Sequence, residues 1–299
     1  MGALGAEYRC PVTDIRPVTD DDFDAVFDLL TARSRAAFGI AAEQPAFLRQ
    51  RWDSASTDNW VAIENGAIVG YAGLDENRDF IHAAKDPGVG DALLAHIEQH
   101  ARDRGFPYVE VVSAPEDAPL YSAVQRNGYA LEREILRMWR LLDGAVPEPT
   151  WPDGVAVRTY TDADAERVHA LLDEQYAGWD PNYVGRSHPS WLTFMTGHDD
   201  FDPAMWFLVE RDGELVACAL HWKATDRRGW VKDLVVRESE RGRGLAKALL
   251  HHGFREYSAR GADRVGLKVD STNPTGAPQL YERLGFVTDQ RLGIWQKQL

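Results

Sequence analysis

The residues with the clearest potential for chemistry lie in one short stretch, Arg-Gly-Arg-Gly-Leu-Ala at 241–246. Glycine lets the backbone approach a ligand closely and adopt conformations that other residues avoid. Lys-Ala-Leu-Leu at 247–250 continues with helical spacing to about Ala259, so the N–H groups of the stretch would lie at the positive end of a helix dipole. With the arginines they suit a pyrophosphate. An ordinary strand–helix connection is the alternative, so the loop alone does not decide.

The segments on either side give this loop its context. Residues 230–236 (Trp-Val-Lys-Asp-Leu-Val-Val) and 265–269 favour β-strands, and Asn273 and the run Leu-Tyr-Glu-Arg-Leu-Gly-Phe at 280–286 follow. Arg241-x-x-Gly244-x-Ala246 resembles the acetyl-CoA motif of the GNAT superfamily, and the later segments resemble its second signature. The resemblance implies an acetyl-CoA-dependent N-acetyltransferase.

By this resemblance, acetyl-CoA would lie along the strand and the loop. The strand backbone would pair with its pantetheine arm as an added strand would. The loop N–H groups would hold its pyrophosphate, and Asn273 would contact the arm farther along. The expected cofactor-binding residues are Leu234, Val235, Val236, Arg241, Gly242, Arg243, Gly244, Leu245, Ala246, Lys247, Asn273 and Tyr281.

Acetyl transfer to an amine needs a base for the amine, a donor for the tetrahedral oxyanion and an acid for the leaving thiolate. Tyr281 stands at the position of the family's acid tyrosine, at the start of the last helix. A phenol with a pKa near 10 can protonate a thiolate. The alternative is that Tyr281 only packs on the apolar face of its helix. A backbone N–H near Val236 is the expected oxyanion donor.

The base is less well defined. Several family members carry a glutamate on the strand before the loop, and Trp230 takes that position here. Asp233 on the same strand and His221 on the preceding strand are the candidates. Asp233 could instead pair with Lys232, and a single histidine on a strand is often a hydrogen-bonded core residue. A water relay would also serve, so the sequence leaves the base open.

The two halves of the chain repeat each other. Ile-Arg-Pro-Val-Thr-Asp-Asp-Asp at 15–22 is echoed at 157–164, and hairpin turns follow at Asn65-Gly66 and Asp212-Gly213. Each copy reads as strand, helices, hairpin, strand, loop and helix, strand, helix, strand. We expect an α/β (α+β) fold of two tandem GNAT-like domains, each a mixed, mostly antiparallel sheet flanked by helices. The expected domains are 1–145 and 154–299, joined by a Pro-rich linker at 146–153.

The first copy is degenerate where the cofactor would bind. Lys-Asp-Pro-Gly-Val-Gly at 85–90 is a remnant of the loop, in which Pro87 lacks a backbone N–H. The strand before it is shortened to about 79–83, and Val124 replaces the tyrosine. We expect a structural or substrate-lining role for this copy, and one acetyl-CoA per chain.

Composition limits the class of protein and its partners. The chain has 299 residues, of which 44% are hydrophobic and 27% charged, as in globular proteins, with no apolar run of membrane-spanning length. Residues 1–12 lack the features of a signal peptide, and Cys10 and Cys218 form no disulfide or metal pattern. A cytoplasmic protein without a metal is expected. The net charge of −14 argues against nucleic acid as a partner.

The expected acceptor is a primary amine of a small molecule. The tandem arrangement resembles mycothiol synthase and the enzymes that N-acetylate bleomycin-type glycopeptide antibiotics in self-resistance. Residues 1–150 contain 25 acidic and 14 basic side chains, which favours a cationic antibiotic as the first candidate, although a solvated surface would look the same. Acetylation of a cysteinyl glycoside is the alternative, with Trp230 and the spacing of Asn273 against it. Peptide or protein acetylation is a further alternative, and a homodimer stays open.

Overall fold

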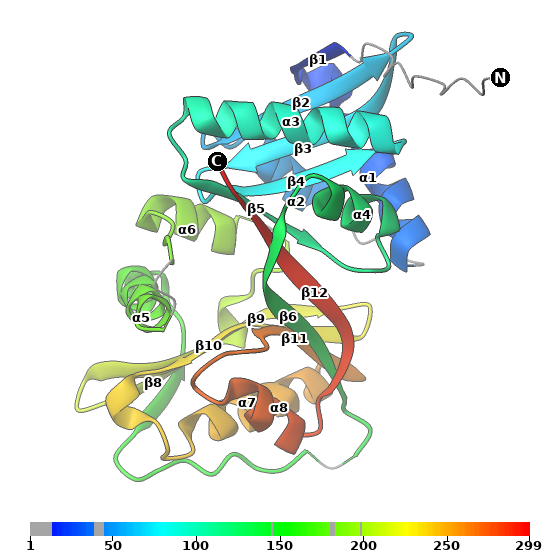
Figure 1. Ribbon diagram of the computed structural model, residues 1–299. Helices are drawn as coiled ribbons and strands as arrows, with labels where there is room; N and C mark the ends of the chain where they lie inside the picture. Colours follow the sequence, from blue (N-terminus) through cyan, green and yellow to red (C-terminus); the bar gives the residue numbers. More distant parts are fainter. Residues whose placement is uncertain (1–13, 39–44, 145, 180–182, 198) are drawn as a thin grey trace, which may run out of the picture. The chain divides into compact units, whose positions relative to one another are not determined.

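The computed structural model describes residues 14–38, 45–144, 146–179, 183–197 and 199–299 (Figure 1). Cys10 and the segment considered as a signal peptide lie outside these residues. The chain divides into two compact units. The first unit is Met1–Glu132 with Leu292–Leu299, and the second unit is Arg133–Arg291.

The order of elements in both halves is the one expected from the sequence. The first half contains β1 (Asp14–Pro17), η1 (Asp20–Asp22), α1 (Phe23–Phe38), α2 (Pro45–Trp52), β2 (Thr57–Glu64), β3 (Ala67–Asp75), β4 (Asp79–Ala84), α3 (Pro87–Asp103), β5 (Tyr108–Ser113), α4 (Ala118–Arg126) and β6 (Ala130–Leu141). The second half contains β7 (Ala156–Thr159), η2 (Asp162–Asp164), α5 (Ala165–Ala177), α6 (His188–Thr196), η3 (Pro203–Met205), β8 (Trp206–Arg211), β9 (Glu214–Thr225), β10 (Arg228–Val236), η4 (Glu238–Glu240), α7 (Leu245–Ala259), β11 (Arg264–Asp270), α8 (Ala277–Arg283) and β12 (Val287–Gln298).

Each unit is built on a mixed sheet. In the first unit β1 to β4 pair antiparallel in sequence order, and β4 pairs parallel with β5. In the second unit β7 to β10 pair antiparallel, and β10 pairs parallel with β11. The hairpin turns have positive φ at both central residues, 50° and 79° at Asn65 and Gly66 and 51° and 81° at Asp212 and Gly213. These values match the twist of two-residue hairpins.

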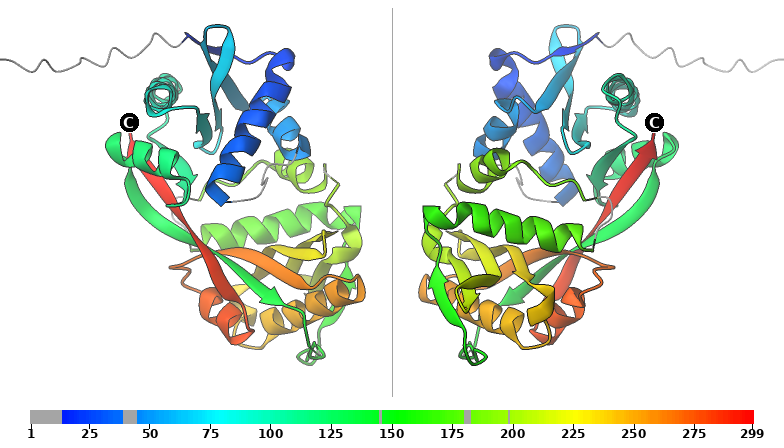
Figure 2. Two further views of the ribbon diagram at one scale, coloured as in Figure 1. Left: turned by 90° about the vertical axis from the view of Figure 1, so that its right-hand side faces the viewer. Right: turned by 90° about the vertical axis from the view of Figure 1, so that its left-hand side faces the viewer.

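Helices cover both faces of each sheet. In the second unit α7 and α8 bury one core against the sheet, which includes Leu249 and Phe254. The opposite face carries a separate core under α5 and α6, which includes Leu171 and Trp191. Figure 2 shows α5 and α7 on opposite sides of these strands. The first unit repeats the arrangement, with α3 and α4 on one face and α1 and α2 on the other. Each sheet is therefore the middle of three layers.

The last strand of each copy completes the sheet of the other copy's unit. Strand β6 pairs antiparallel with β11 of the second unit from Leu141↔Arg264 to Ile135↔Asp270. The end of β12 pairs with β5 of the first unit, from Gly293↔Ser113 to Gln298↔Tyr108. The chain thus passes from the first unit to the second inside β6 and returns inside β12.

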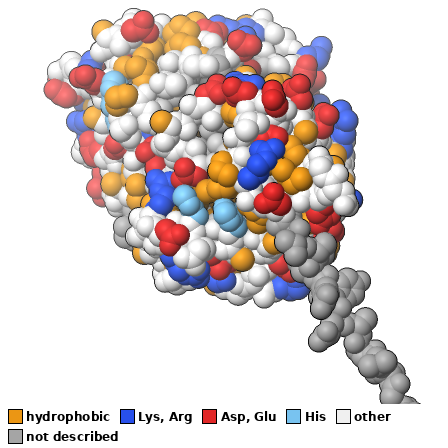
Figure 3. Space-filling model, turned by 90° about the horizontal axis from the view of Figure 1, so that it is seen from above, with side chains coloured by type: hydrophobic (Ala, Val, Ile, Leu, Met, Phe, Trp, Pro, Cys, Tyr) orange, Lys and Arg blue, Asp and Glu red, His pale blue; other side chains and the backbone are white. Residues whose placement is uncertain are grey.

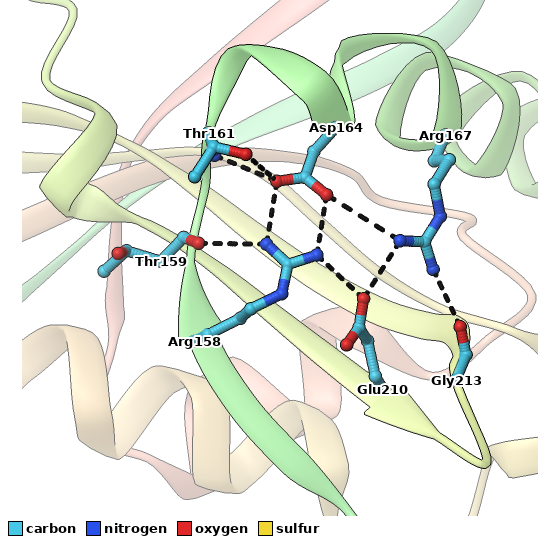
Figure 4. A network of polar contacts seen from close by, with 7 residues as sticks. All are labelled: Arg158, Thr159, Thr161, Asp164, Arg167, Glu210 and Gly213. Atoms are coloured by element: carbon cyan, nitrogen blue, oxygen red, sulfur yellow. Dashed lines mark hydrogen bonds and ion pairs between the residues drawn. The ribbon is translucent and has the colours of Figure 1, made fainter.

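The duplication is visible in one repeated polar network. In the second unit Arg158 donates to both carboxylate oxygens of Asp164 at 2.7 and 2.6 Å, and Asp164 accepts from the backbone N–H and hydroxyl of Thr161 (Figure 4). In the first unit Arg16, Asp22 and Thr19 make the same four bonds. Each network ties the first strand to the start of the first helix, as a capping box does.

The surface shown in Figure 3 carries mixed charge. This view looks onto the face where β1, β2 and α3 lie at the top of Figure 1, and acidic, basic and apolar side chains are interspersed over it. Among the described residues, no helix is both long enough and apolar enough to cross a membrane.

Candidate active site

The site begins where two parallel strands separate. Strand β10 pairs with β11 over four residues, from Arg228↔Arg264 to Val231↔Leu267. A register shift follows between Val231 and Asp233, after which β10 stays paired with β9 as far as Val236↔Ala217. Within the described part of the chain, no strand pairs with the other edge of residues 233–236. Their backbone groups on that edge therefore line a cavity and resemble the open edge that an extended ligand can join.

The loop after β10 leads to an open helix N-terminus. Gly242 and Gly244 have φ of 75° and 88°, which favours glycine, and a Cβ on either would meet nothing within 4 Å. Gly244 is the N-cap of α7, and no side chain of the described residues caps this helix. The first N–H groups of α7 are thus available to an anion, which the helix dipole also attracts.

Arg241 fixes this loop to the rest of the unit. Its Nη2 donates to Oε1 of Gln175 on α5 at 2.7 Å, and its Nε donates to the carbonyl of Val236 at 3.2 Å. Arg243 instead approaches Glu240 at 3.6 Å and does not line the cavity. The side chain of Arg241 therefore holds the loop against β10 and α5, whereas Arg243 does not line the cavity.

The cavity has a volume of about 700 Å³ and lies within the second unit. Of the residues expected from the sequence to form the site, all but Arg243 and His221 line it. Six basic and three acidic side chains line it, although the chain as a whole has a net charge of −14. An excess of cations in an acidic protein suits a ligand with several negative charges, such as the phosphates of acetyl-CoA.

A cluster of titratable groups lies at the strand separation. Tyr176 on α5 donates from its hydroxyl to Oδ1 of Asp233 at 2.6 Å, and Nζ of Lys232 lies 3.3 Å from Oδ2. Asp233 and Tyr281 are both buried in the wall of the cavity. Burial raises the pKa of Tyr281, and the nearby charge of Asp233 raises it further. Burial and the same carboxylate also raise the pKa of the Cys218 thiol.

Tyr281 sits differently in its helix than the sequence suggests. It is the fifth residue of α8, in the second turn, because Gly276 with φ of 76° caps the helix and Pro278 lies in its first turn. Its ring packs on Phe286 at 5.6 Å, so the packing role expected as an alternative is present. The cavity lining shows that this packing does not remove Tyr281 from the site.

His221 is not brought to the cavity. It is fully buried on β9 opposite Val231, and its ring packs on Phe207, Tyr257 and the backbone of Gly253. Burial lowers its pKa to about 3, so the ring is neutral at physiological pH. His221 therefore lies outside the cavity lining, on the face of β9 that strand alternation turns to α7.

Trp230 leaves no carboxylate at the position where other family members have a glutamate. Its ring packs on Trp139 at 5.5 Å, and a Cβ at Gly266 would lie 2.7 Å from it. Its backbone N–H donates to the hydroxyl of Tyr257 at 2.9 Å.

Tyr176, which the sequence did not single out, is the hydrogen-bond partner of Asp233. The only sequence signal for it is its place in the last turn of α5.

The equivalent region of the first unit carries polar contacts that the second unit lacks. Helix α3 begins at Pro87, and the Asp86 carboxylate accepts from the N–H of Val89 at 3.1 Å. Arg33 stands in the repeat where Gln175 stands in the second copy. It pairs with Asp117, which is 1% exposed, and donates to the His82 carbonyl at 2.6 Å. The Asp86 carboxylate thus caps the N-terminus of α3, whereas no side chain of the described residues caps the N-terminus of α7.

Comparisons with known proteins agree with this geometry. The Acetyltransferase (GNAT) family matches residues 23–129 and 165–286. The chain is 30% identical over 296 residues to a mycothiol acetyltransferase of Streptomyces coelicolor, covering 93% of each, and 36% identical over 285 residues to that of Streptomyces avermitilis, covering 89% of each. A GCN5-related N-acetyltransferase from Sphaerobacter thermophilus is 25% identical with a TM-score of 0.75, covering 96% of this chain and 95% of that one.

A tandem GNAT protein from the clavulanic acid biosynthesis pathway shares the fold, with 18% identity and a TM-score of 0.73 over 96% of this chain and 98% of that one. Acetyl-CoA is the co-substrate of these acetyltransferases, and the open strand edge, the uncapped helix and the basic cavity suit it. Both halves of the chain match the same family. The chain therefore belongs to the GNAT family of acetyltransferases and is an N-acetyltransferase with tandem GNAT domains.

Proposed function

We propose that the second unit transfers the acetyl group of acetyl-CoA to a primary amine of a small molecule. The observation that carries the proposal is a single cavity that contains the open edge of residues 233–236, the uncapped N-terminus of α7 and the buried pair Asp233 and Tyr281. The strand edge would bind the pantetheine arm, and the α7 N–H groups would bind the pyrophosphate. Asn273, which also lines the cavity, would contact the arm.

Asp233 and Tyr281 would divide the proton transfers. Asp233 takes a proton from the acceptor ammonium, directly or through one water, and the amine nitrogen then attacks the thioester carbonyl. A backbone N–H near Val236 donates to the oxyanion, and the C–S bond breaks as Tyr281 protonates the sulfur. The Tyr281 phenolate then takes the second proton from the amide nitrogen. The raised pKa of Tyr281 keeps its proton in place beforehand. When Asp233 accepts a proton its charge is lost, so the pKa of Tyr281 falls when its proton is needed.

The first unit would take no part in the chemistry. Asp86 occupies the helix N-terminus, and the Arg33–Asp117 pair is buried in the region equivalent to the cavity. We propose residues 1–145 as the degenerate, structural domain, 146–153 as a connecting segment and 154–299 as the domain that supplies the catalytic groups. The buried free thiol of Cys218 fits a cytoplasmic location, which we also propose.

The names of the relatives favour a cysteinyl glycoside as acceptor. Three mycothiol acetyltransferases are 30%, 32% and 36% identical to this chain and cover 93%, 90% and 89% of it. A cationic glycopeptide antibiotic is the second candidate, supported by the acidic composition of residues 1–150. Trp230 in place of the family glutamate sets this chain apart, and the proposed base, Asp233, lies three residues farther along β10.

The test is thiol release from acetyl-CoA with cysteinyl glucosaminyl inositol, a bleomycin-type glycopeptide, an aminoglycoside and a peptide as acceptors. We expect turnover with at least one small amine, and Asp233→Asn to reduce kcat by about a hundredfold or more while acetyl-CoA still binds. Asp200→Asn, at an aspartate outside the cavity lining, is the control. Calorimetry should give one acetyl-CoA per chain. Unchanged turnover in Asp233→Asn contradicts its role as base, and two cofactors per chain contradict the closed first unit.

A further inference from the structure

Three basic side chains stand side by side on adjacent strands of the second unit, and two of them are among the cations that line the cavity. They are Arg137 on β6, Lys268 on β11 and Lys232 on β10, called here the cation row. Arg137 and Lys268 are direct cross-strand partners. Lys232 follows Val231, whose parallel partner Leu267 precedes Lys268, so the row continues to the third strand.

All three point to the same face of the sheet, the face under α5 and α6. On β11 and β6 the neighbours on either side, Leu267 and Val269 and likewise Leu136 and Met138, belong to the α7 core. Strand alternation therefore turns Lys268 and Arg137 to the α5 face. The ammonium of Lys232 lies 5.9 Å from the ring centre of Phe194 on α6.

The row carries more positive charge than its neighbours neutralise. Arg137 pairs with Asp289 at 2.7 Å, and Lys232 pairs with Asp233 at 3.3 Å. Among the described residues, Lys268 has no carboxylate partner within ion-pair distance, although it lies directly opposite Arg137. Like charges opposite each other destabilise an antiparallel pair. Lys268 is an exposed side chain of β11 and lies beside the charges of Arg137 and Lys232.

The position of the cation row indicates which ligand it would bind. Lys232 and Lys268 both line the cavity that holds Asp233 and Tyr281. The open N-terminus of α7, assigned to the cofactor phosphates, lines the same cavity, and the body of α7 packs on the other face of the sheet. The α5 face is also the face from which Tyr176 contacts Asp233, the proposed base for the acceptor. A ligand group that neutralises the row would therefore belong to the acceptor.

We propose that the acceptor amine carries an acidic group, a carboxylate or a phosphate monoester, which Lys268 binds together with Lys232. This inference rests on the proposed function and narrows it. Acidic amines become better acceptors than uncharged ones, and the cysteinyl glycoside suggested by the relatives, which has no acidic group, becomes a weaker acceptor. Amino and guanidinium groups bind such anions through charge-assisted hydrogen bonds.

The first experiment compares matched acceptors by thiol release from acetyl-CoA. Glucosamine 6-phosphate is compared with glucosamine, and β-alanine with β-alaninamide, which separates a phosphate from a carboxylate preference. We expect the acidic member of at least one pair to have a kcat/KM about tenfold higher. Lys268→Met should raise the KM of that acid about tenfold and leave the uncharged member and the Kd of acetyl-CoA unchanged. Lys223→Met, at an exposed lysine of the same unit outside the cavity lining, should change nothing.

Uncharged amines that react as well as their acidic partners overturn the inference and leave the proposed function standing. The same holds if Lys268→Met weakens both members of a pair equally, or if it weakens acetyl-CoA binding instead. A second readout does not depend on turnover. With the protein saturated with coenzyme A, calorimetry should detect inorganic phosphate or acetate binding to the parent and not to Lys268→Met. If no amine at all is acetylated, the proposed function fails, and this titration still decides whether the cation row binds an anion.

Discussion

Gly244 allows the cofactor assignment to be tested against a control within the same helix. Gly244 and Gly261 flank the two ends of α7, with φ of 88° and 79°, and a Cβ on either would meet nothing within 4 Å. An aspartate at either position pays a similar backbone cost of about 1 kcal/mol for the left-handed conformation. The helix dipole also favours a carboxylate at the N-terminus and disfavours one at the C-terminus, so Gly261→Asp should lower the free energy of unfolding, measured in urea, by more than Gly244→Asp.

The two variants should differ in acetyl-CoA binding. At Gly244 the new carboxylate enters the cavity that we assign to the pyrophosphate. Two like charges about 5 Å apart repel by roughly 1–3 kcal/mol between a water-like and a surface dielectric. Calorimetry should therefore show a Kd about five- to 150-fold weaker for Gly244→Asp, with the loss reduced at high salt, and an unchanged Kd for Gly261→Asp. Equal affinities for both variants would refute the placement of the phosphates at α7.

Three further outcomes are expected. Tyr281→Phe should lower kcat by about a hundredfold or more while the Kd of acetyl-CoA stays within about twofold, and equal turnover rejects the acid role. Asp164→Asn should cost about 2 kcal/mol of unfolding free energy at pH 7, and Asp22→Asn a similar amount. Arg158 and Arg16 depress the pKa of the Asp164 and Asp22 carboxyls, so these carboxylates contribute stability above their unfolded pKa of about 4 and lose it as pH falls below that value. The loss of unfolding free energy in each variant, relative to the parent, should therefore become smaller in acid. Met138→Ala should speed amide hydrogen exchange in α7 and β11, because Met138 packs in the core of the second unit. Trp295→Ala should speed it in α3 and β4, because Trp295 packs in the core of the first unit. Faster exchange in α3 and β4 for Met138→Ala, or in α7 and β11 for Trp295→Ala, would contradict the strand exchange.

Local features of the sequence predicted local structure well. Asn65-Gly66 and Asp212-Gly213 require positive φ at adjacent residues, and both form the expected hairpin turns. Helical spacing placed the end of α7 at Ala259, where the structure ends it. In each of these cases the determining interactions lie within a few residues, so the residue types are sufficient.

Contacts between distant residues were not predictable in the same way. Tyr176 and Asp233 meet although 57 residues separate them. His221 looked as suitable a base as Asp233, because residue type does not show which face of a strand a side chain takes; the register opposite Val231 and the bulge after it decide that. The cation row likewise depends on cross-strand register between β6, β11 and β10. A shift of one residue in the pairing register of a strand would turn its side chains to the other face of the sheet.

The strand exchange explains how the first copy contributes to the cavity of the second unit. Strand β6 belongs to the sequence of the first copy, yet it completes the sheet beside β11 and contributes Met138 to the α7 core. It also places Arg137 opposite Lys268 and brings Arg133 and Ile135 to the cavity wall. Removing the first copy at the Pro-rich segment would therefore remove part of the sheet of the second unit and one end of the cation row. The Asp86 carboxylate at the N-terminus of α3 does not affect this contribution. The N-termini of α3 and α7 can therefore carry different groups while β6 stays paired with β11 and β12 stays paired with β5.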